Sequence, residues 1–241
     1  HYSLGDGLDQ LADTAGSDTV RFGAGIFFDN TVVRLMEAAG ITTALHGLIK
    51  LKSGEIAYVT RRFDREKHGN KLKKIAVEDF CQLSGLLTER KYKTSMEKAG
   101  KIILTYSSNP GLDVVTFFDL ALFSFLTGNA DMHLKNFSLM TQESGELGLS
   151  PAYDLISTRL MPIDDAEEMA LTLNGKKARL TRGDFEAMGE TLKIPRKAVG
   201  NSFERMARAL PKIKSVIRAS FLSPTLKNRY EKLIRLRADT L

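Results

Sequence analysis

Three oxygen-bearing side chains in the middle of the sequence have the types and the spacing that phosphoryl transfer requires. Asp131 and Asn136 lie five residues apart, and Asp154 follows eighteen residues later. Phosphoryl transfer needs a carboxylate that accepts the proton of the attacking hydroxyl, and hard oxygen ligands that hold Mg²⁺ on the nucleotide phosphates. Each residue alone is equally typical of a turn or a helix cap. Together they predict a base at Asp131 and metal ligands at Asn136 and Asp154.

Two basic side chains alternate with these positions. If Met132 and Leu134 point into a core, His133 and Lys135 lie on the same side of the chain as Asp131. Lys135 would then stabilise the transferred phosphate, while His133 either takes part or orients the loop through a hydrogen bond. Because no Cys or His partner stands at metal-ligand spacing, a zinc site is not expected.

Length and composition are those of an ordinary soluble globular protein. The 241 residues, 43% hydrophobic and 27% charged, suffice for one large domain or two lobes. The longest apolar run, residues 114–126, is interrupted by polar side chains and is shorter than the ~20 residues that cross a bilayer. The start lacks a basic segment followed by an apolar one, so no signal peptide is expected. The single cysteine, Cys81, cannot form an internal disulfide, and we expect a cytoplasmic protein without a membrane partner.

The net charge of +6 is unevenly spread. Residues 196–241 contain twelve Lys and Arg against three Asp and Glu, so the rest of the chain is net negative. A basic C-terminal segment would face nucleic acid, an acidic protein, or only solvent beside a packed amphipathic face.

The apolar periodicity predicts a mixed first half of the chain. After a weakly ordered start, the expected elements are a strand, a helix closed by Gly40, a hairpin, a charged loop and a second helix, at residues 19–22, 30–39, 46–51 with 56–63, 64–74 and 77–87.

The second half is predicted to be mostly helical. A break at residues 109–111 precedes residues 112–126, which are apolar almost all round and predict a fully buried helix directly before Asp131. Two short strands and four helices are expected beyond it, at residues 137–140, 147–149, 182–192, 197–209, 212–219 and 224–237. The outline is an α+β fold with two lobes, a small mixed N-lobe (incomplete in this sequence) at residues 1–65 and a larger, mostly helical C-lobe at residues 66–241.

Several segments resemble the HipA family of bacterial Ser/Thr protein kinases. Two of them contain the candidate base and metal ligands: residues 128–138, Gly-Asn-Ala-Asp-Met-His-Leu-Lys-Asn-Phe-Ser, and residues 150–158, Ser-Pro-Ala-Tyr-Asp-Leu-Ile-Ser-Thr. Residues 58–65 resemble the family's hinge, 78–83 the helix after it, and 173–177 a signature of its C-lobe. The resemblance covers about residues 29–210, and it implies a two-lobed protein-kinase-like fold.

The resemblance also implies roles for single residues. Asp131 would be the catalytic base, and Asn136 and Asp154 would bind Mg²⁺. Backbone groups of Arg61 and Phe63 would meet the adenine of ATP, and the side chains near the ribose or phosphates would be those of Asp64, Gln82, His133 and, as argued above, Lys135. Family members are toxins of toxin–antitoxin modules that phosphorylate a serine of an aminoacyl-tRNA synthetase. Their partner is a helix-turn-helix antitoxin that binds operator DNA.

The N-terminal part departs from the family's pattern. A kinase also needs a Gly-rich loop and a Lys, which in this family precede the position of Asp29, where the family usually has Glu. The first Lys here is Lys50, and Arg21, the cation on the predicted first strand, is a poor substitute for a Lys point charge. Three explanations stay open: a trimmed chain, an N-lobe completed by another chain, or a degenerate kinase.

Three functions therefore compete. The first is an ATP- and Mg²⁺-dependent Ser/Thr kinase acting as a toxin. The second is an inactive kinase-like module that binds an antitoxin or nucleic acid through the basic C-terminal helices. The third is a small-molecule kinase, which shares the Asp-to-Asn spacing but is disfavoured by the Tyr-Asp-Leu-Ile-Ser context of Asp154 and by the hinge segment.

Overall fold

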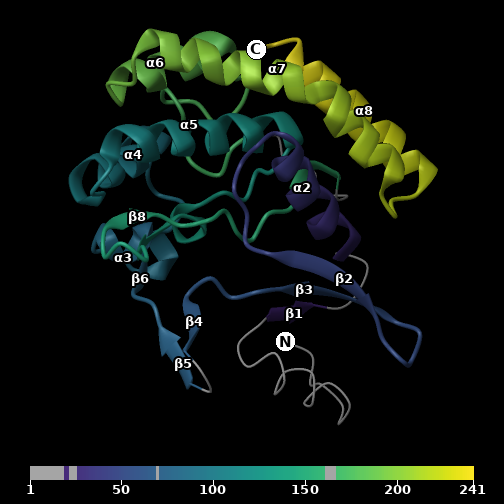
Figure 1. The fold of residues 1–241 in the computed structure, drawn as a ribbon. Coiled ribbons are helices and arrows are strands. Elements are labelled where there is room, and N and C mark those ends of the chain that lie inside the picture. Colours follow the sequence, from purple (N-terminus) through teal and green to yellow (C-terminus); the bar gives the residue numbers. More distant parts are fainter. Residues whose placement is uncertain (1–18, 22–25, 69–70, 161–166) are drawn as a thin grey trace.

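The computed structural model describes residues 19–21, 26–68, 71–160 and 167–241 (Figure 1). Most of the segment that the sequence predicts to be a weakly ordered start lies outside these ranges. Most of the regular secondary structure in the described ranges is helical, and three small sheets lie below the main helices in this view. Helices α6, α7 and α8 form an upper layer that covers α4 and α5.

The first sheet carries the start of the predicted hinge. It contains β1 (Thr19–Arg21), β3 (Ile56–Thr60) and β2 (His46–Lys50) in that order, all antiparallel. The predicted strand and hairpin are thus confirmed. Ala57 and Tyr58 on β3 are buried, and α2 lies against this strand, so the end of β3 is fixed from one side.

Two predictions for residues 64–87 are wrong. The predicted loop is a second sheet, an antiparallel hairpin of β4 (Arg65–His68) and β5 (Lys71–Lys74), in which Glu66 lies opposite Lys73. The predicted helix at 77–87 is instead a strand, β6 (Val77–Asp79), followed by the single-turn helix α3 (Phe80–Leu83). Such short strands are stabilised by cross-strand neighbours rather than by their own sequence pattern.

The third sheet supports the loop that carries the candidate chemistry. Its order is β6, β7 (Ser138–Thr141) and β8 (Leu147–Leu149), again antiparallel. The predicted pair of strands at 137–140 and 147–149 is confirmed, and β6 is the added partner on the far side of β7.

The central helices surround one apolar core. Helix α2 (Ile26–Ala38) begins before its predicted start and is followed by Gly40 at φ 79°. Helix α4 (Met96–Tyr106) was not predicted; its N-terminal Lys98 amide donates to the Ser95 hydroxyl. Helix α5 (Pro110–Thr127) begins at the predicted break, because proline at the first helical position needs no amide partner there.

Helix α5 is the core helix of the fold. It is the one described helix that is long and apolar enough to cross a membrane, but 67% of it is buried inside the protein. Its neighbours are α4, α7, α8 and β8. The buried aromatic residues Phe117, Phe118, Phe123 and Phe125 pack there against other core side chains. Burial on all sides accounts for the apolar composition of the helix.

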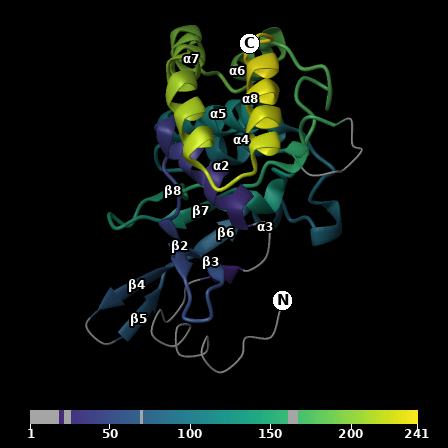
Figure 2. The same cartoon turned by 90° about the vertical axis from the view of Figure 1, so that its right-hand side faces the viewer.

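The last three helices form a layer over this core. They are α6 (Arg182–Thr191), α7 (Arg196–Ala219) and α8 (Pro224–Ala238), and Figure 2 shows α7 and α8 side by side. The helices predicted at 197–209 and 212–219 are one helix with Pro211 inside it. Proline costs a helix interior about 3 kcal/mol. Buried residues on both sides of it, such as Met206 and Ile213, continue one apolar face and offset that cost.

Candidate active site

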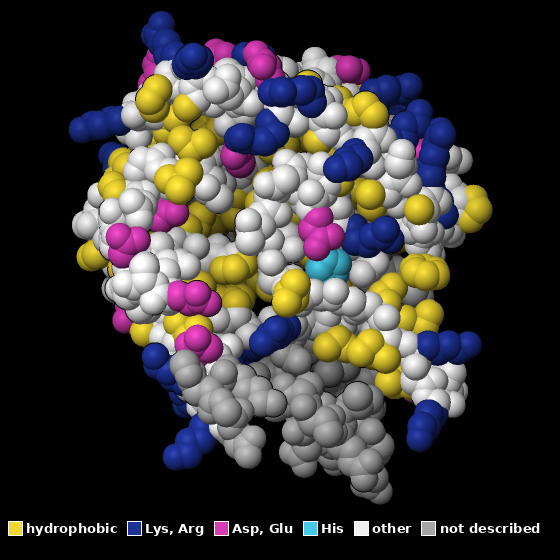
Figure 3. Space-filling model, in the orientation of Figure 1, with side chains coloured by type: hydrophobic (Ala, Val, Ile, Leu, Met, Phe, Trp, Pro, Cys, Tyr) yellow, Lys and Arg dark blue, Asp and Glu magenta, His cyan; other side chains and the backbone are white. Residues whose placement is uncertain are grey.

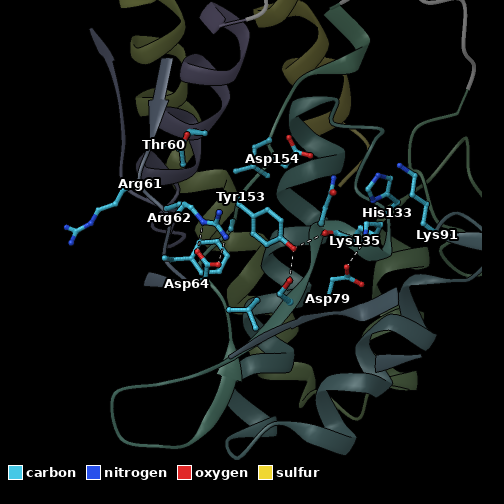
Figure 4. Close-up of a pocket in the computed structure, with 18 of the residues that line it drawn as sticks. Thr60, Arg61, Arg62, Asp64, Asp79, Lys91, His133, Lys135, Tyr153 and Asp154 are labelled. Atoms are coloured by element: carbon cyan, nitrogen blue, oxygen red, sulfur yellow. Dashed lines mark hydrogen bonds and ion pairs between the residues drawn. The ribbon is translucent and has the colours of Figure 1, made fainter. Parts of the chain in front are cut away.

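A cleft of about 630 Å³ lies between the segment after β3 and the loop after α5 (Figure 4). Every predicted site residue except Asp131 lines it: Arg61, Phe63, Asp64, Gln82, His133, Lys135, Asn136 and Asp154. In Figure 4 the hinge residues lie on one side, His133 and Lys91 on the other, and Tyr153 and Asp154 between them.

The hinge wall is held by an ion-pair cluster. The Asp64 carboxylate accepts from Arg62 Nε at 2.8 Å and Nη2 at 2.5 Å, and from Arg65 Nη1 at 2.6 Å. The hydrogen bond from Arg62 lowers the pKa of Asp64, so the carboxylate is charged at neutral pH. Phe63 packs on Tyr153 with ring centroids 5.4 Å apart. The Arg61 side chain points away from the cleft. Its backbone amide donates to the Leu45 carbonyl at 2.8 Å, which leaves the Arg61 carbonyl for contacts inside the cleft.

The loop that carries Asp131 is fixed through its own backbone. Helix α5 ends at Gly128, whose φ of 73° turns the chain out of the helix. The Asp131 carbonyl oxygen then accepts from the His133 amide and from Asn136 Nδ2, both at 2.9 Å. Met132 and Leu134 are buried, which meets the condition under which His133 and Lys135 share a side with Asp131. These contacts hold Asp131 next to the cleft rather than among its lining residues.

Tyr92 holds the Asp131 side chain. Its hydroxyl donates to Asp131 Oδ1 at 2.8 Å, although the two residues are 39 positions apart. Burial and this hydrogen bond raise the pKa of Tyr92 to about 12, so the hydroxyl remains a donor at neutral pH. The Tyr92 ring also meets the His133 ring edge-on, with centroids 5.0 Å apart.

His133 enters the cleft as a buried, neutral side chain. Only 5% of its surface is exposed. Burial lowers its pKa below 6.5, and the nearby Asp131 opposes that effect without cancelling it. The imidazole is therefore uncharged near pH 7 and would act through hydrogen bonds.

Lys135 is engaged by an acidic partner inside the cleft. Its Nζ lies 2.8 Å from Asp79 Oδ2, and the hydrogen bond to Asp79 raises the pKa of the lysine. The other carboxylate oxygen of Asp79 accepts from the Gln82 amide at 2.9 Å, and Gln82 Oε1 accepts from the Asp79 amide at 2.9 Å. This capping box begins α3. Lys135 thus joins the Asp131 loop to α3.

The donor set fits Mg²⁺ bound to a nucleotide. Asn136 is 4% exposed, and because its Nδ2 is engaged by the Asp131 carbonyl, Oδ1 is left to act as an oxygen ligand. Asp154 lines the same cleft at φ 55°, a left-handed conformation that costs a non-glycine residue about 1 kcal/mol. In the described ranges no three His, Cys, Asp or Glu residues cluster as metal ligands. Mg²⁺ needs no such cluster, since one or two side chains and phosphate oxygens suffice.

One predicted signature lies outside the cleft and is structural. In residues 173–177, Asn174 and Gly175 both have positive φ, and Leu173 pairs with Lys176 in a tight turn. Asn174 Nδ2 and Lys176 Nζ donate to Asp184 Oδ1 at 2.9 and 2.8 Å. The segment therefore fastens the start of α6.

Sequence reasoning missed three residues of this region: Lys91, Tyr92 and Tyr153. Tyr153 donates to the Lys135 carbonyl at 2.7 Å and lies 2.6 Å from the Ser138 hydroxyl, so it supports the cleft floor. Tyr153 lies within residues 150–158, directly before Asp154, and this position was the available sequence signal. Lys91 and Tyr92 carry no such signal, because only the tertiary fold brings them to the Asp131 loop.

Two solved structures show this fold. The chain superimposes with a TM-score of 0.79 on a chain of the Shewanella oneidensis MR-1 complex of HipA, HipB and operator DNA, at 21% identity over 92% of this chain and 58% of that one. It superimposes with a TM-score of 0.67 on the Helicobacter pylori proinflammatory kinase CtkA, at 18% identity over 93% and 87%. The protein has a mixed, mostly helical kinase-like fold.

The chain belongs to the family of the HipA-like C-terminal domain, whose model matches residues 29–213. It is 30% identical over 196 residues to a Sinorhizobium fredii protein named "Putative kinase Y4mE", and 25% identical over 173 residues to the serine/threonine-protein kinase toxin HipA of Shewanella oneidensis. These matches cover 76% and 64% of this chain but only 45% and 40% of the relatives. The chain thus spans about half the length of these relatives or less.

Proposed function

We propose that this chain is part of an ATP- and Mg²⁺-dependent Ser/Thr protein kinase. The observation that carries the proposal is the Asn136 side chain, which binds the Asp131 carbonyl and lines the same cleft as Asp154. The base and both metal ligands then share one rigid frame, which phosphoryl transfer requires. Residues 1–65 would form the N-lobe side of the cleft and residues 66–241 the C-lobe.

In this reaction Asp131 accepts the proton of a substrate hydroxyl while the hydroxyl oxygen attacks the γ-phosphorus and the bond to the leaving ADP oxygen breaks. Asn136 and Asp154 would hold Mg²⁺, which neutralises charge on the phosphates when bound. The hinge backbone at Arg61 and Phe63 would meet the adenine. The side chains expected near the ribose and phosphates are those of Asp64, Gln82, His133 and Lys135.

Membership in the family supports a proposal for the biological role. We propose a cytoplasmic toxin that phosphorylates a protein, with a serine of an aminoacyl-tRNA synthetase as the expected target, and thereby inhibits growth. The Shewanella neighbour's complex with HipB and operator DNA supports a helix-turn-helix antitoxin as partner. DNA would be reached through that complex or through the basic C-terminal helices.

A second candidate, an inactive kinase-like binding module, is favoured by the charge on those helices. Lys and Arg side chains gather over the upper and right-hand part of the face in Figure 3, where α7 and α8 lie. The exposed cations without a carboxylate partner among the ion pairs of the described chain include Lys212, Arg229, Lys232 and Arg235. Such a surface would bind an acidic antitoxin or nucleic acid.

Nucleotide-dependent thermal stability distinguishes the two. At about a hundred times its Kd, Mg-ATP should stabilise the kinase by about 2.7 kcal/mol, and Asp154→Ala should remove most of this effect. Asp131→Ala should keep the stabilisation and lose transfer of labelled γ-phosphate, because it removes only the base. A chain without any response to Mg-ATP, but with strongly salt-dependent binding to DNA or RNA, would support the binding module instead.

A further inference from the structure

Among the described residues, four cations line the cleft, and three of them are paired with a carboxylate or point out of it. Arg62 binds Asp64, and Lys135 binds Asp79. Arg61 points out of the cleft (Figure 4). The fourth is Lys91, for which the described ranges supply no carboxylate partner. Its Nζ lies 5.0 Å from the centroid of the Tyr92 ring, a contact that leaves the ammonium able to donate hydrogen bonds.

Lys91 is anchored to the Asp131 loop. Its carbonyl oxygen accepts from the Leu134 amide at 3.3 Å, and the next residue, Tyr92, binds Asp131 Oδ1. Because both contacts involve the same short stretch, the Lys91 backbone has a fixed place relative to the proposed base. The side chain is half-buried and runs beside the His133 ring in Figure 4.

The position of Lys91 matches the far end of a bound nucleotide. The hinge lies at the opposite side of the cleft, with Asp154 between the two (Figure 4). A nucleotide whose base meets the hinge and whose metal meets Asp154 would extend its phosphates toward Lys91. Bound phosphates require positive charge at this end of the cleft, and Lys91 is a cation that lines the cleft there.

We propose that Lys91 binds the terminal phosphates of a nucleoside triphosphate in this cleft. This inference rests on the proposed nucleotide-binding function. It adds to that function a phosphate-binding cation from the proposed C-lobe. A lysine ammonium is a compact charge suited to phosphate oxygens. A nucleoside has no phosphates, so loss of the Lys91 contact should weaken binding of the triphosphate more than binding of the nucleoside.

Calorimetric titration of the 241-residue chain with Mg-ATP, Mg-ADP and adenosine tests this proposal. The variants are Lys91→Gln, which removes the charge, and Lys93→Gln, a matched control at an exposed lysine that does not line the cleft. Loss of a charge-assisted hydrogen bond, worth about 1.5–3 kcal/mol, should weaken Mg-ATP binding by Lys91→Gln roughly ten-fold or more. Adenosine binding should be unchanged, and Lys93→Gln should behave as the wild type.

Two outcomes would overturn the inference in different ways. If the wild type binds Mg-ATP and Lys91→Gln binds it equally well, or loses ATP and adenosine affinity alike, Lys91 is not a phosphate ligand while the kinase proposal stands. If the wild type binds none of the three ligands, the nucleotide site itself is wrong. Lys91→Arg keeps the positive charge and should retain the preference for Mg-ATP over adenosine. That result would show that the charge of residue 91, rather than the fold of the loop, produces the preference.

Discussion

At the residue scale, Tyr92 decides how the Asp131 carboxylate is presented. A carboxylate can rotate about its last bond, and a hydroxyl donor on Oδ1 restrains this rotation. Oδ2 is then the atom left to receive a proton from a substrate hydroxyl. Because the Tyr92 ring also packs on His133, the hydroxyl is held in place from two sides. Tyr92 is therefore expected to position the base without contacting the substrate.

Tyr92→Phe isolates this effect. The ring and its contact with His133 remain, while the hydrogen bond to Asp131 is lost. We expect kcat for transfer of labelled γ-phosphate, including autophosphorylation, to fall about ten-fold, the equivalent of ~1.4 kcal/mol. KM for ATP should change little, because Tyr92 does not line the cleft. A variant with wild-type kcat, or one in which only KM rises, would contradict a positioning role.

Part of the site was predictable because its residues follow one another in sequence. Asp131, Asn136 and Asp154 lie on two loops that one resemblance covers, and the structure brings Asn136 and Asp154 to one cleft. Lys91 could not be found in this way, since it follows η1 (Thr88–Arg90), far from the Asp131 loop in sequence, and meets that loop only through the folded backbone, where its carbonyl accepts from the Leu134 amide. Lys135 was predicted as a phosphate contact from its charge and its alternation with Asp131. Its ion pair with Asp79 depends on β6, which local periodicity had assigned to a helix.

At the scale of elements, the start of α6 depends on a buried carboxylate. Asp184 is 3% exposed. Burial alone would raise its pKa, but hydrogen bonds from Lys176, Asn174 and Thr181 outweigh burial and lower it to about 2. The same carboxylate completes a capping box with Thr181. The tight turn at Asn174 and the helix are thus held by one charge.

Asp184→Asn should lower the free energy of unfolding at pH 7 by roughly 2 kcal/mol. A carboxylate with a lowered folded-state pKa stabilises the protein above its ordinary pKa of 3.8, and this contribution is lost as the pH falls toward about 2. The difference from the wild type in urea unfolding should therefore shrink below pH 3.8. Glu186→Gln, an exposed acid on the same helix, is the control and should change stability by under about 0.5 kcal/mol. A pH-independent difference would refute the assignment.

The sequence predicts helices and strands correctly where the local residue pattern and the tertiary packing favour the same structure. The largely apolar α5 and the amphipathic α6 and α8 were predicted for this reason. Two helices were predicted around Pro211, because a proline ring normally interrupts a helix. The burial of Met206 and Ile213 on one face instead favours a single continuous helix. The β4–β5 hairpin was missed for the opposite reason, since its charged sequence lacks the apolar alternation by which strands are recognised.

At the scale of the whole molecule, the last helix supports the first residue of the Asp131 loop. Arg237 on α8 is buried, donates to the Phe125 carbonyl and lies with its guanidinium 4.6 Å from the Phe125 ring centroid. Leu233 on the same helix lies so close to Gly128 that an added Cβ would meet its Cδ2 at 2.7 Å. The end of α5, where the loop begins, is thus enclosed by a segment about a hundred residues away in sequence.

Gly128→Ala should test this contact when compared with Gly40→Ala. Both glycines have positive φ, 73° and 79°, but a Cβ at Gly40 would meet no atom within 4 Å. Gly40→Ala should cost about 1 kcal/mol of backbone strain, and Gly128→Ala about 1–3 kcal/mol more because of overpacking against Leu233. In a Leu233→Ala background the excess cost of Gly128→Ala over Gly40→Ala in urea unfolding should shrink to the smaller part due to Arg159, whose Cβ lies 3.0 Å from the added carbon. An undiminished excess there would show that α8 is not what confines the loop.

The β4–β5 hairpin has a consequence for how molecules of this protein meet one another. A two-stranded sheet has open edges whose unpaired amide and carbonyl groups can recruit a strand from a second molecule. All four residues of β5 are exposed, and Lys71, Lys73 and Lys74 place like charges along it. Two copies approaching edge to edge would repel each other, and salt would weaken this repulsion. The lysines thus protect the hairpin against self-association, and light scattering should show more aggregation when Lys71 and Lys73 are both replaced by Thr.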